Sequence, residues 1–540
     1  MLSFFKINKI NYTYIFFILF FIVGFNIYKD YGISIDEDNT RINGFVGLKY
    51  IFDIFNYDYN SRLNAFPSIS EFPEKGIGYV FDVPAALIEY IFEINDPRSF
   101  FLIRHLLNFI YFFVGTIFFY LILKNRYKSF GLAILGTLFL IVSPRIFANA
   151  FYNNKDIIFL SLFIIATYFS IRTLQESSFI NSTLASIFIG LATGMRILGV
   201  YMAILLLFFL TIKYLRNEKN KNQILITLLR LLFLIPVCII LFYPFLWSNP
   251  ISNFLFVFER LSNFGWYGYN FYLGDYIKAN NVPWHYSLVW IYATTPVLYL
   301  IFFTYGFFLI TKRMFLRLLN IDKKKIYNDL WRGEREMLDI FFFSIVFFPI
   351  FLIIIINSTL YTGWRHLYFI YPFVVILTIH GLNSIKIKYF KNFPKIFFFI
   401  IFLSLTLNIN WIIKNHPNQN LYFNYFFKNN FDKLFELDYW GVTINQNLNH
   451  INKIHLGSYK ISNIGNMDLL LNKKFLNKEN RNRMIIVGDV LSADYVIINN
   501  IHWDGNKSRK KKLLDGRFIK IHEIKVSNKT ISSVYKNNIN

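Results

Sequence analysis

Eleven long apolar segments fill the first 412 residues of this chain and leave little choice of fold. A helix needs roughly 20 apolar residues to cross the hydrocarbon core of a bilayer, and runs such as 231–247 and 341–356 approach that length. The chain is 55% hydrophobic and 16% charged, which excludes an ordinary soluble domain. The pattern predicts an all-α polytopic membrane protein with helices near 12–29, 101–123, 129–142, 157–172, 179–194, 197–215, 225–247, 286–311, 338–357, 366–382 and 396–412.

The basic residues indicate how these helices are oriented. The net charge is +24, but the lysines and arginines gather in short loops at 124–128, 213–221, 312–335 and 386–395. Cytoplasmic loops are enriched in Lys and Arg, so these loops and the N-terminus are predicted to be cytoplasmic. We therefore expect membrane lipids, and no nucleic acid, as partners. Segment 12–28 lacks a small-residue cleavage site and is expected to remain as a signal anchor, and eleven crossings then place the C-terminus outside.

Two domains are expected. Residues 1–412 form the transmembrane domain, in which 30–100 is a first external loop with interfacial helices. Residues 413–540 are more polar and are predicted to be a small extracytoplasmic α/β domain. Its elements are a helix within 431–449 and short strands at 484–487, 495–499, 518–526 and 530–535.

The first external loop carries Ser34-Ile35-Asp36-Glu37 just after a predicted span. Ser34 followed by Glu37 has the spacing of a capping box, which predicts a helix that begins there. Glu37 would then bond the backbone at the helix start, with Arg41 as a further partner. Asp36 would stay free and ionised in the first turn, where it could act as a general base. The alternative is that both acids only cap an interfacial helix.

Several cations are predicted to lie on the same external face, where the topology rule makes them scarce. They are Arg104, Arg145, Lys155, Arg196 and Arg365, together with the acids Asp36, Asp82 and Asp156 and the neighbouring His105 and His366. Each cation alone could simply snorkel at a helix end. As a set, cations and acids at one interface favour a lipid-linked phosphate substrate with a base beside it.

At these residues the sequence resembles the GT-C class of integral-membrane glycosyltransferases, especially bacterial relatives of protein O-mannosyltransferases and lipid A aminoarabinose transferases, as in bacterial glycosyltransferase family 39. The resemblance covers most of residues 30 to 441. The matching pieces, in order, are Tyr31-Gly32-Ile33-Ser34-Ile35-Asp36-Glu37 with Arg41, Arg104-His105, Ser143-Pro144-Arg145, Asn154-Lys155-Asp156, 190–199 with Arg196, Pro283-Trp284-His285-Tyr286, Trp364-Arg365-His366, His416-Pro417, Tyr422-Phe423-Asn424 and Asp438-Tyr439-Trp440-Gly441.

The resemblance implies a transferase in a bacterial inner membrane that uses a polyprenyl-phosphate sugar as donor and an external acceptor of unknown identity. It implies Asp36 as catalytic base and Glu37 as the second acid. Arg365, followed by Arg196, Lys155 and Arg145, would neutralise the donor phosphate. The other residues that it implies at the substrate site are Arg41, Asp82, Arg104, His105, Asp156 and His366. No cofactor is required by the sequence, and a divalent metal has no support in it.

The chain departs from the family in two places. Loop 248–285 is too short for the β-trefoil repeats of protein mannosyltransferases, and the C-terminal domain differs from that of an aminoarabinose transferase. Two other classes of function remain open. A flippase or transporter of lipid-linked sugars would need the same cations but no base. A non-catalytic envelope assembly protein would depend on residues 413–540 and would need neither Asp36 nor Arg365.

Overall fold

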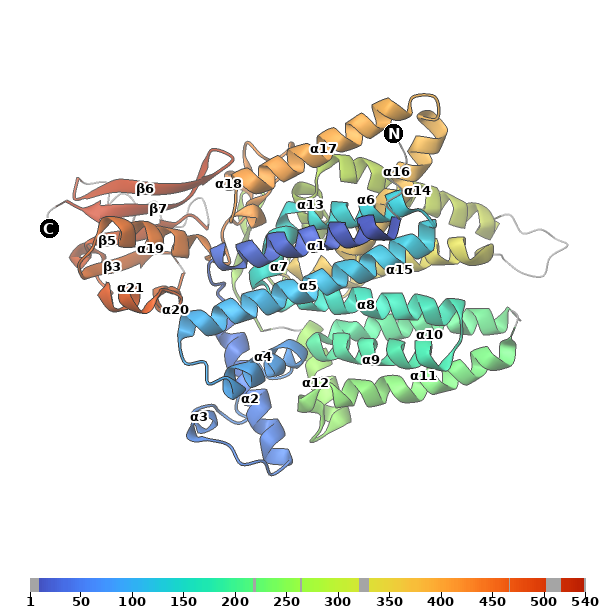
Figure 1. Ribbon diagram of the computed structural model, residues 1–540, viewed down its shortest axis with the longest axis horizontal. Helices are drawn as coiled ribbons and strands as arrows, with labels where there is room; N and C mark the ends of the chain where they lie inside the picture. The colour runs from blue at the N-terminus through green and yellow to red at the C-terminus, as the bar shows by residue number, and fades with distance from the viewer. Residues whose placement is uncertain are drawn as a thin grey trace, which may run out of the picture.

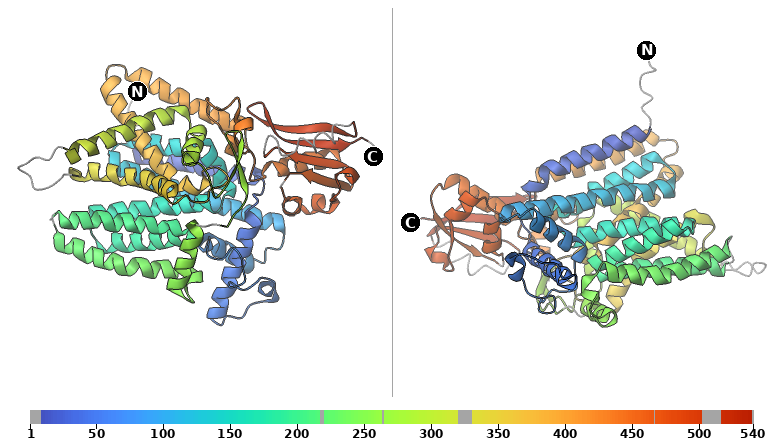
Figure 2. Two further views of the ribbon diagram at one scale, coloured as in Figure 1. Left: turned by 180° about the vertical axis from the view of Figure 1, so that it is seen from behind. Right: turned by 60° about the horizontal axis from the view of Figure 1, so that its bottom comes forward.

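A bundle of long helices, with a small sheet domain at one end, makes up the computed structural model of the chain (Figure 1). The structure describes residues 9–216, 220–262, 265–319, 330–465, 467–501 and 516–538. The sheet domain and the helices of the first external loop lie at the same end of the bundle, as the further views confirm (Figure 2). The first helix runs toward this end, so the loop that follows it reaches the sheet domain.

The bundle consists of helices that coincide with the predicted apolar segments and of one short helix over 144–152, where no helix was predicted. They are α1 (Lys9–Ile27), α5 (Pro97–Tyr127), α6 (Phe130–Ile141), α7 (Pro144–Tyr152), α8 (Asp156–Gln175), α9 (Phe179–Met195), α10 (Val200–Leu215), α11 (Lys221–Leu241), α14 (Val297–Leu319), α15 (Gly333–Ile355), α16 (Tyr371–Tyr389) and α17 (Pro394–Lys414). In the described ranges, nine helices are long and apolar enough to cross a membrane, and the bent pair α6 and α7 makes a tenth. Helix α9 is apolar but shorter. The predicted polytopic helical class is confirmed.

One helix break agrees with the prediction, and two boundaries differ from it. The stretch 179–215 breaks at Arg196, as expected. The predicted helix 286–311 is wrong as a single element, because it divides into α13 (Tyr286–Thr294) and α14. Pro296 lies in the gap, and its missing N–H cannot continue the helical hydrogen bonding. The predicted helix 366–382 is preceded by a 3₁₀ helix, Arg365–Ile370, that carries two of the predicted site residues.

Helices α14 and α16 approach each other closely because both have glycine at the contact. A Cβ at Gly306 would meet the Leu377 carbonyl, and one at Gly381 would meet the Phe302 carbonyl. Small residues of this kind allow membrane helices to pack backbone against backbone.

The first external loop folds into α2 (Glu37–Ile54), α3 (Ser61–Asn64) and α4 (Tyr79–Ile91). The predicted capping box is only half formed. The Ser34 N–H donates to the Glu37 carboxylate at 2.7 Å, but the Ser34 hydroxyl donates to the Tyr152 carbonyl instead of capping the helix. Helix α2 therefore begins at Glu37 and has Asp36 at its N-cap position.

Loop 248–285 contains α12 (Pro250–Ser262) and a short hairpin of β1 (Tyr269–Tyr272) and β2 (Asp275–Lys278), which the sequence did not predict. The strands are too short to show a clear alternation of apolar and polar residues. Tyr272 forms an isolated bridge with Phe435. The hairpin thus joins the membrane domain to the chain that follows α17.

The C-terminal domain has a five-stranded sheet of order β4-β3-β5-β7-β6. Its strands are β3 (Tyr459–Ile464), β4 (Met484–Ile486), β5 (Tyr495–Asn499), β6 (Phe518–Val526) and β7 (Lys529–Asn537), and its helices are α19 (Thr443–Ile454), α20 (Leu469–Lys474) and α21 (Lys478–Arg483). The four predicted strands are present, and β3 was missed. The predicted helix 431–449 is two elements, α18 (Phe431–Leu434) and α19.

The C-terminal domain contacts the loop that carries Asp36. The Ile35 N–H donates to the Trp440 carbonyl at 3.1 Å. Lys474 pairs with Asp38 at 2.7 Å, next to an apolar contact in which Phe475 packs with Ile33. These contacts fix the position of the chain immediately before α2.

Candidate active site

Asp36 lies where three segments of the chain meet. Its carboxylate makes no capping hydrogen bond to α2 and is 23% exposed. Arg365, at the start of the 3₁₀ helix, donates to Asp36 Oδ2 at 2.9 Å. Lys155 Nζ, just before α8, lies 3.9 Å from the same oxygen. The predicted base is thus a partly buried carboxylate between two cations.

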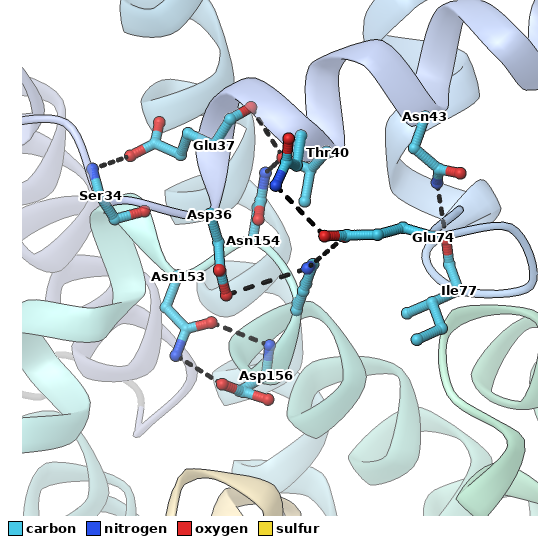
Figure 3. A network of polar contacts seen from close by, with 12 residues as sticks. Ser34, Asp36, Glu37, Thr40, Asn43, Glu74, Ile77, Asn153, Asn154 and Asp156 are labelled. Atoms are coloured by element: carbon cyan, nitrogen blue, oxygen red, sulfur yellow. Dashed lines mark hydrogen bonds and ion pairs between the residues drawn. The ribbon is translucent and has the colours of Figure 1, made fainter. Parts of the chain in front are cut away.

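Hydrogen bonds from the loop before α8 hold these segments together (Figure 3). The Asn154 side chain donates to the Thr40 hydroxyl of α2 at 2.8 Å. Asn153 donates to Asp156 at 2.9 Å and accepts from the Asp156 N–H at 3.0 Å. These bonds fix the loop in position, and Lys155, which follows the two asparagines, points toward Asp36.

Arg196 enters the site through the break between α9 and α10. Its guanidinium forms an ion pair with Asp156, which is buried at the start of α8. Asp156 therefore holds a cation in place. Because Arg196 ends α9, a continuous helix over 179–215 could not present this side chain in the same way.

A cavity of about 340 Å³ opens beside Asp36. One part of its wall is charged and polar, and is formed by Asp36, Glu74, Lys75, Lys155, Arg196, Arg260, Ser358, Thr359, Tyr361, Arg365 and His366. Another part is apolar and is formed by Ile197, Leu198, Val257, Leu352, Ile353, Ile356 and Leu367. Five cations and two carboxylates line the cavity, so its charged end favours anions.

The cations control the ionisation of Asp36. Burial alone would raise the pKa of this carboxyl, but Lys155, Arg365 and Arg196 outweigh it and hold the pKa well below the ordinary value of 3.8. In turn, Asp36 and Glu74 outweigh the burial of Lys155 and raise its pKa. Both groups are charged at neutral pH, as the sequence predicted for Asp36.

Four of the predicted substrate-site residues, and Glu37, lie away from the cavity in ion pairs behind α2. Glu37 accepts from the Ser34 N–H and lies 2.9 Å from His105 Nε2. The expected pair of Glu37 with Arg41 does not form. Arg41 instead forms an ion pair with Glu89 at 2.5 Å, and Glu89 also pairs with Arg62. Asp82 lies 3.4 Å from Arg104. These buried pairs hold α2 and α4 against α5.

Arg145 takes a third position. It lies in α7, is 4% exposed, and does not line the cavity. Its guanidinium is 5.4 Å from the ring centres of Trp290 and Phe423. The structure therefore separates Arg145 from Lys155, Arg196 and Arg365, with which the sequence had grouped it.

The sequence did not single out Glu74, although it lines the cavity and lies 3.5 Å from Lys155. The only sequence feature that could have indicated Glu74 is weak: Glu74 and Lys75 form a charged pair before a glycine in a long loop. Of the aromatic residues in loop 248–285, Trp266 lines the cavity and stacks on Tyr361 at 4.7 Å, whereas Tyr267 is 83% exposed.

No three His, Cys, Asp or Glu side chains gather closely enough to hold a metal ion in the ranges that the structure describes. His366 lines the cavity together with Asp36 and Glu74, but the three do not form such a group.

Comparison with known families supports a transferase. Residues 83–243, from α4 to just beyond α11, match the family model described as dolichyl-phosphate-mannose-protein mannosyltransferase. The match includes Lys155 and Arg196 but neither Asp36 nor Arg365. A comparison with curated proteins gave no match. The family match supports a multi-pass membrane glycosyltransferase that uses a polyprenyl-phosphate sugar donor, and it confirms that the chain resembles the GT-C class, with residues 83–243 similar to its protein mannosyltransferases.

Proposed function

We propose that this protein transfers a sugar from a polyprenyl phosphate to an acceptor outside the cytoplasm, with Asp36 as general base. The observation that carries the proposal is the lining of the cavity beside Asp36. Cations and apolar side chains both line it, and a polyprenyl-phosphate sugar likewise combines a charged head with an apolar tail.

The cations at the charged end would bind the donor phosphate. Arg365 and Lys155 already approach one oxyanion, the Asp36 carboxylate, and Arg196 is held beside them by Asp156. When the bond between the anomeric carbon and the phosphate oxygen breaks, negative charge grows on the leaving phosphate. Fixed cations at that point stabilise the transition state more than the ground state.

The phosphate would also alter Asp36. In the free protein the three cations keep Asp36 a weak base, because they hold its pKa low. A bound phosphate shares these cations, so the Asp36 carboxylate regains basicity close to the anomeric carbon. Asp36 then takes the proton of an acceptor hydroxyl or amine as that group attacks the anomeric carbon, with inversion by a single displacement.

Position in the membrane follows from the same arrangement. We propose that the protein lies in a bacterial inner membrane with its N-terminus in the cytoplasm. Helix α2, which begins next to Asp36, and the C-terminal domain lie at the same end of the bundle, which then faces the periplasm or the cell exterior (Figure 1). This orientation places the basic loops 124–128 and 386–395 at the cytoplasmic end, as the positive-inside rule requires.

The test is glycosyl transfer by purified protein in lipid, from a panel of synthetic polyprenyl-phosphate sugars, with native membrane extract as the source of acceptors. We expect donor hydrolysis or transfer that is lost in Asp36→Asn. Donor binding without turnover in the wild type would instead indicate transport of the lipid-linked sugar. Turnover that survives in Asp36→Asn would remove Asp36 as the base.

A further inference from the structure

Arg145 differs from the other predicted site cations because it has no acid partner among the residues that the structure describes. Arg41, Arg104, Arg196 and Arg365 each pair with a carboxylate. Arg145 is 4% exposed, pairs with no carboxylate within the described parts of the chain, and has no hydrogen-bond partner for its Nε. Its contacts are the faces of Trp290 and Phe423.

Such an arrangement is costly for a protein that holds nothing else there. A guanidinium loses its hydration on burial, and the attraction of two aromatic faces recovers only part of that loss. Buried arginines are therefore normally paired with an anion. The unpaired charge of Arg145 indicates a place that an anion completes.

Two hydroxyl groups beside Arg145 point to the same conclusion. The Tyr368 and Tyr439 side chains are buried and interact electrostatically with Arg145 and with each other. Within the described parts of the chain, neither hydroxyl has a hydrogen-bond partner of good geometry, although each interacts with the other hydroxyl and with Arg145. Burial raises the pKa of Tyr439 well above its ordinary value, so its hydroxyl stays protonated and able to donate.

This cluster lies next to the cavity but on the side of the C-terminal domain. Tyr439 is followed by Trp440, whose ring lies 4.9 Å from the Arg365 guanidinium. Tyr368 lies one turn after Arg365 in the 3₁₀ helix. Arg365 therefore stands between the cavity with Asp36 and the cluster of Arg145, Tyr368 and Tyr439.

We infer that Arg145, Tyr368 and Tyr439 form a second oxyanion-binding site, which holds a phosphate or carboxylate carried by a substrate of the proposed transfer. The inference rests on the proposed function for its role in transfer but not for the binding itself. The oxyanion belongs either to the acceptor or to the transferred sugar, since both must lie beyond the donor phosphate as seen from the apolar wall.

Thermal unfolding of the purified full-length protein in detergent tests the site without any turnover. We expect Arg145→Met to unfold at the same temperature as the wild type or a few degrees higher, because it removes an unpaired buried charge. The matched control is Arg104→Met, which leaves Asp82 buried without its partner and should unfold at a lower temperature. A clear loss of stability in Arg145→Met would make Arg145 a packing element and overturn the inference.

Inorganic phosphate serves as the probe for binding. In an Arg365→Met background, which weakens the first phosphate site, phosphate should still raise the unfolding temperature. That increase should disappear in the double variant Arg365→Met with Arg145→Met. The same increase in both proteins would mean that Arg145 binds no oxyanion.

Activity then identifies which substrate carries the group. Because Arg145→Met loses a charged hydrogen bond to the oxyanion, its rate of transfer should be about 10- to 100-fold lower than that of the wild type. An oxyanion on the acceptor predicts a larger fall in transfer than in donor hydrolysis by water. An oxyanion on the sugar predicts equal falls in both, confined to donors with an anionic sugar. A wild type that turns over no donor would contradict the proposed function alone, because the phosphate measurement is independent of it.

Discussion

Arg365 donates a hydrogen bond to Asp36 at 2.9 Å across 329 positions of sequence, and the pair places a strong cation against the proposed base. The guanidinium is held on its other sides by the rings of Tyr361 and Trp440, each 4.9 Å away. Because the same cation is proposed to bind the donor phosphate, the base and the phosphate site are coupled.

Replacing Asp36 by Asn should lower turnover about 10²- to 10⁴-fold, because general base catalysis contributes this much. Donor affinity should stay the same or rise, since the amide no longer competes with phosphate for Arg365 and Lys155. Donor binding and transfer are measured on the same preparation. Asp38→Asn is the matched control: it lies in the same turn, pairs with Lys474 and does not line the cavity. Equal losses in both variants would contradict a specific role for Asp36.

Replacing Arg365 by Lys should raise the KM for donor about tenfold or more although the charge is kept. Lysine lacks the planar fork that binds two oxygens and cannot lie flat between two rings. The comparison is with Arg172→Lys, an exposed arginine paired with Glu176. Unchanged donor KM in Arg365→Lys would mean that the phosphate binds elsewhere.

Activity should depend on pH through Asp36 in a way that Arg365 controls. The pKa of Asp36 is lowered in the free protein, so the acid limb of kcat/KM should lie below the ordinary value of 3.8. Arg365→Met should move this limb to higher pH, because one of the cations that lower the pKa is gone. The profile is measured with donor hydrolysis as the readout. A limb that does not move would show that Asp36 is not the titrating group.

Two substitutions at Glu37 distinguish support from catalysis. Glu37 is buried between the Ser34 N–H and His105. Glu37→Gln keeps an oxygen that can accept from Ser34 and should retain much of the activity. Glu37→Ala leaves both partners buried and unpaired, and should cost about 1–3 kcal/mol of unfolding free energy. If the glutamine variant is as inactive as Asp36→Asn while its stability is normal, Glu37 takes part in the chemistry.

Glu436 should make the stability of the protein fall as the pH rises from 4.5 to about 8. Burial raises its pKa from the ordinary 4.5 to about 8, so the folded protein favours the neutral acid. The stabilisation from this group is complete below pH 4.5 and is lost as pH rises toward 8. Glu436→Gln, which is always neutral, should therefore unfold at a less pH-dependent temperature between pH 5 and 9. Glu479→Gln, on an exposed face of α21, should leave the wild-type dependence unchanged.

The elements that depend on local sequence were predictable. The membrane helices follow from apolar runs, and the break at Arg196 follows from the length of 179–215. Asp36 could be identified as a free carboxylate at a helix start because Glu37, three residues after Ser34, had the spacing to bond the backbone. The four C-terminal strands β4, β5, β6 and β7 followed from their own composition. The break at Pro296 was missed, because the apolar run continues through it.

Which cations reach Asp36 was decided by the tertiary structure alone. Arg41 lies five residues after Asp36 but pairs with Glu89. Arg365, which is 329 positions from Asp36 in the sequence, pairs with it. Arg145 shares the predicted face with both and meets neither acid. The physical reason is that a sequence shows which side chains carry charge and which side of the membrane they occupy, while an ion pair forms only where packed helices bring two side chains within a few ångströms.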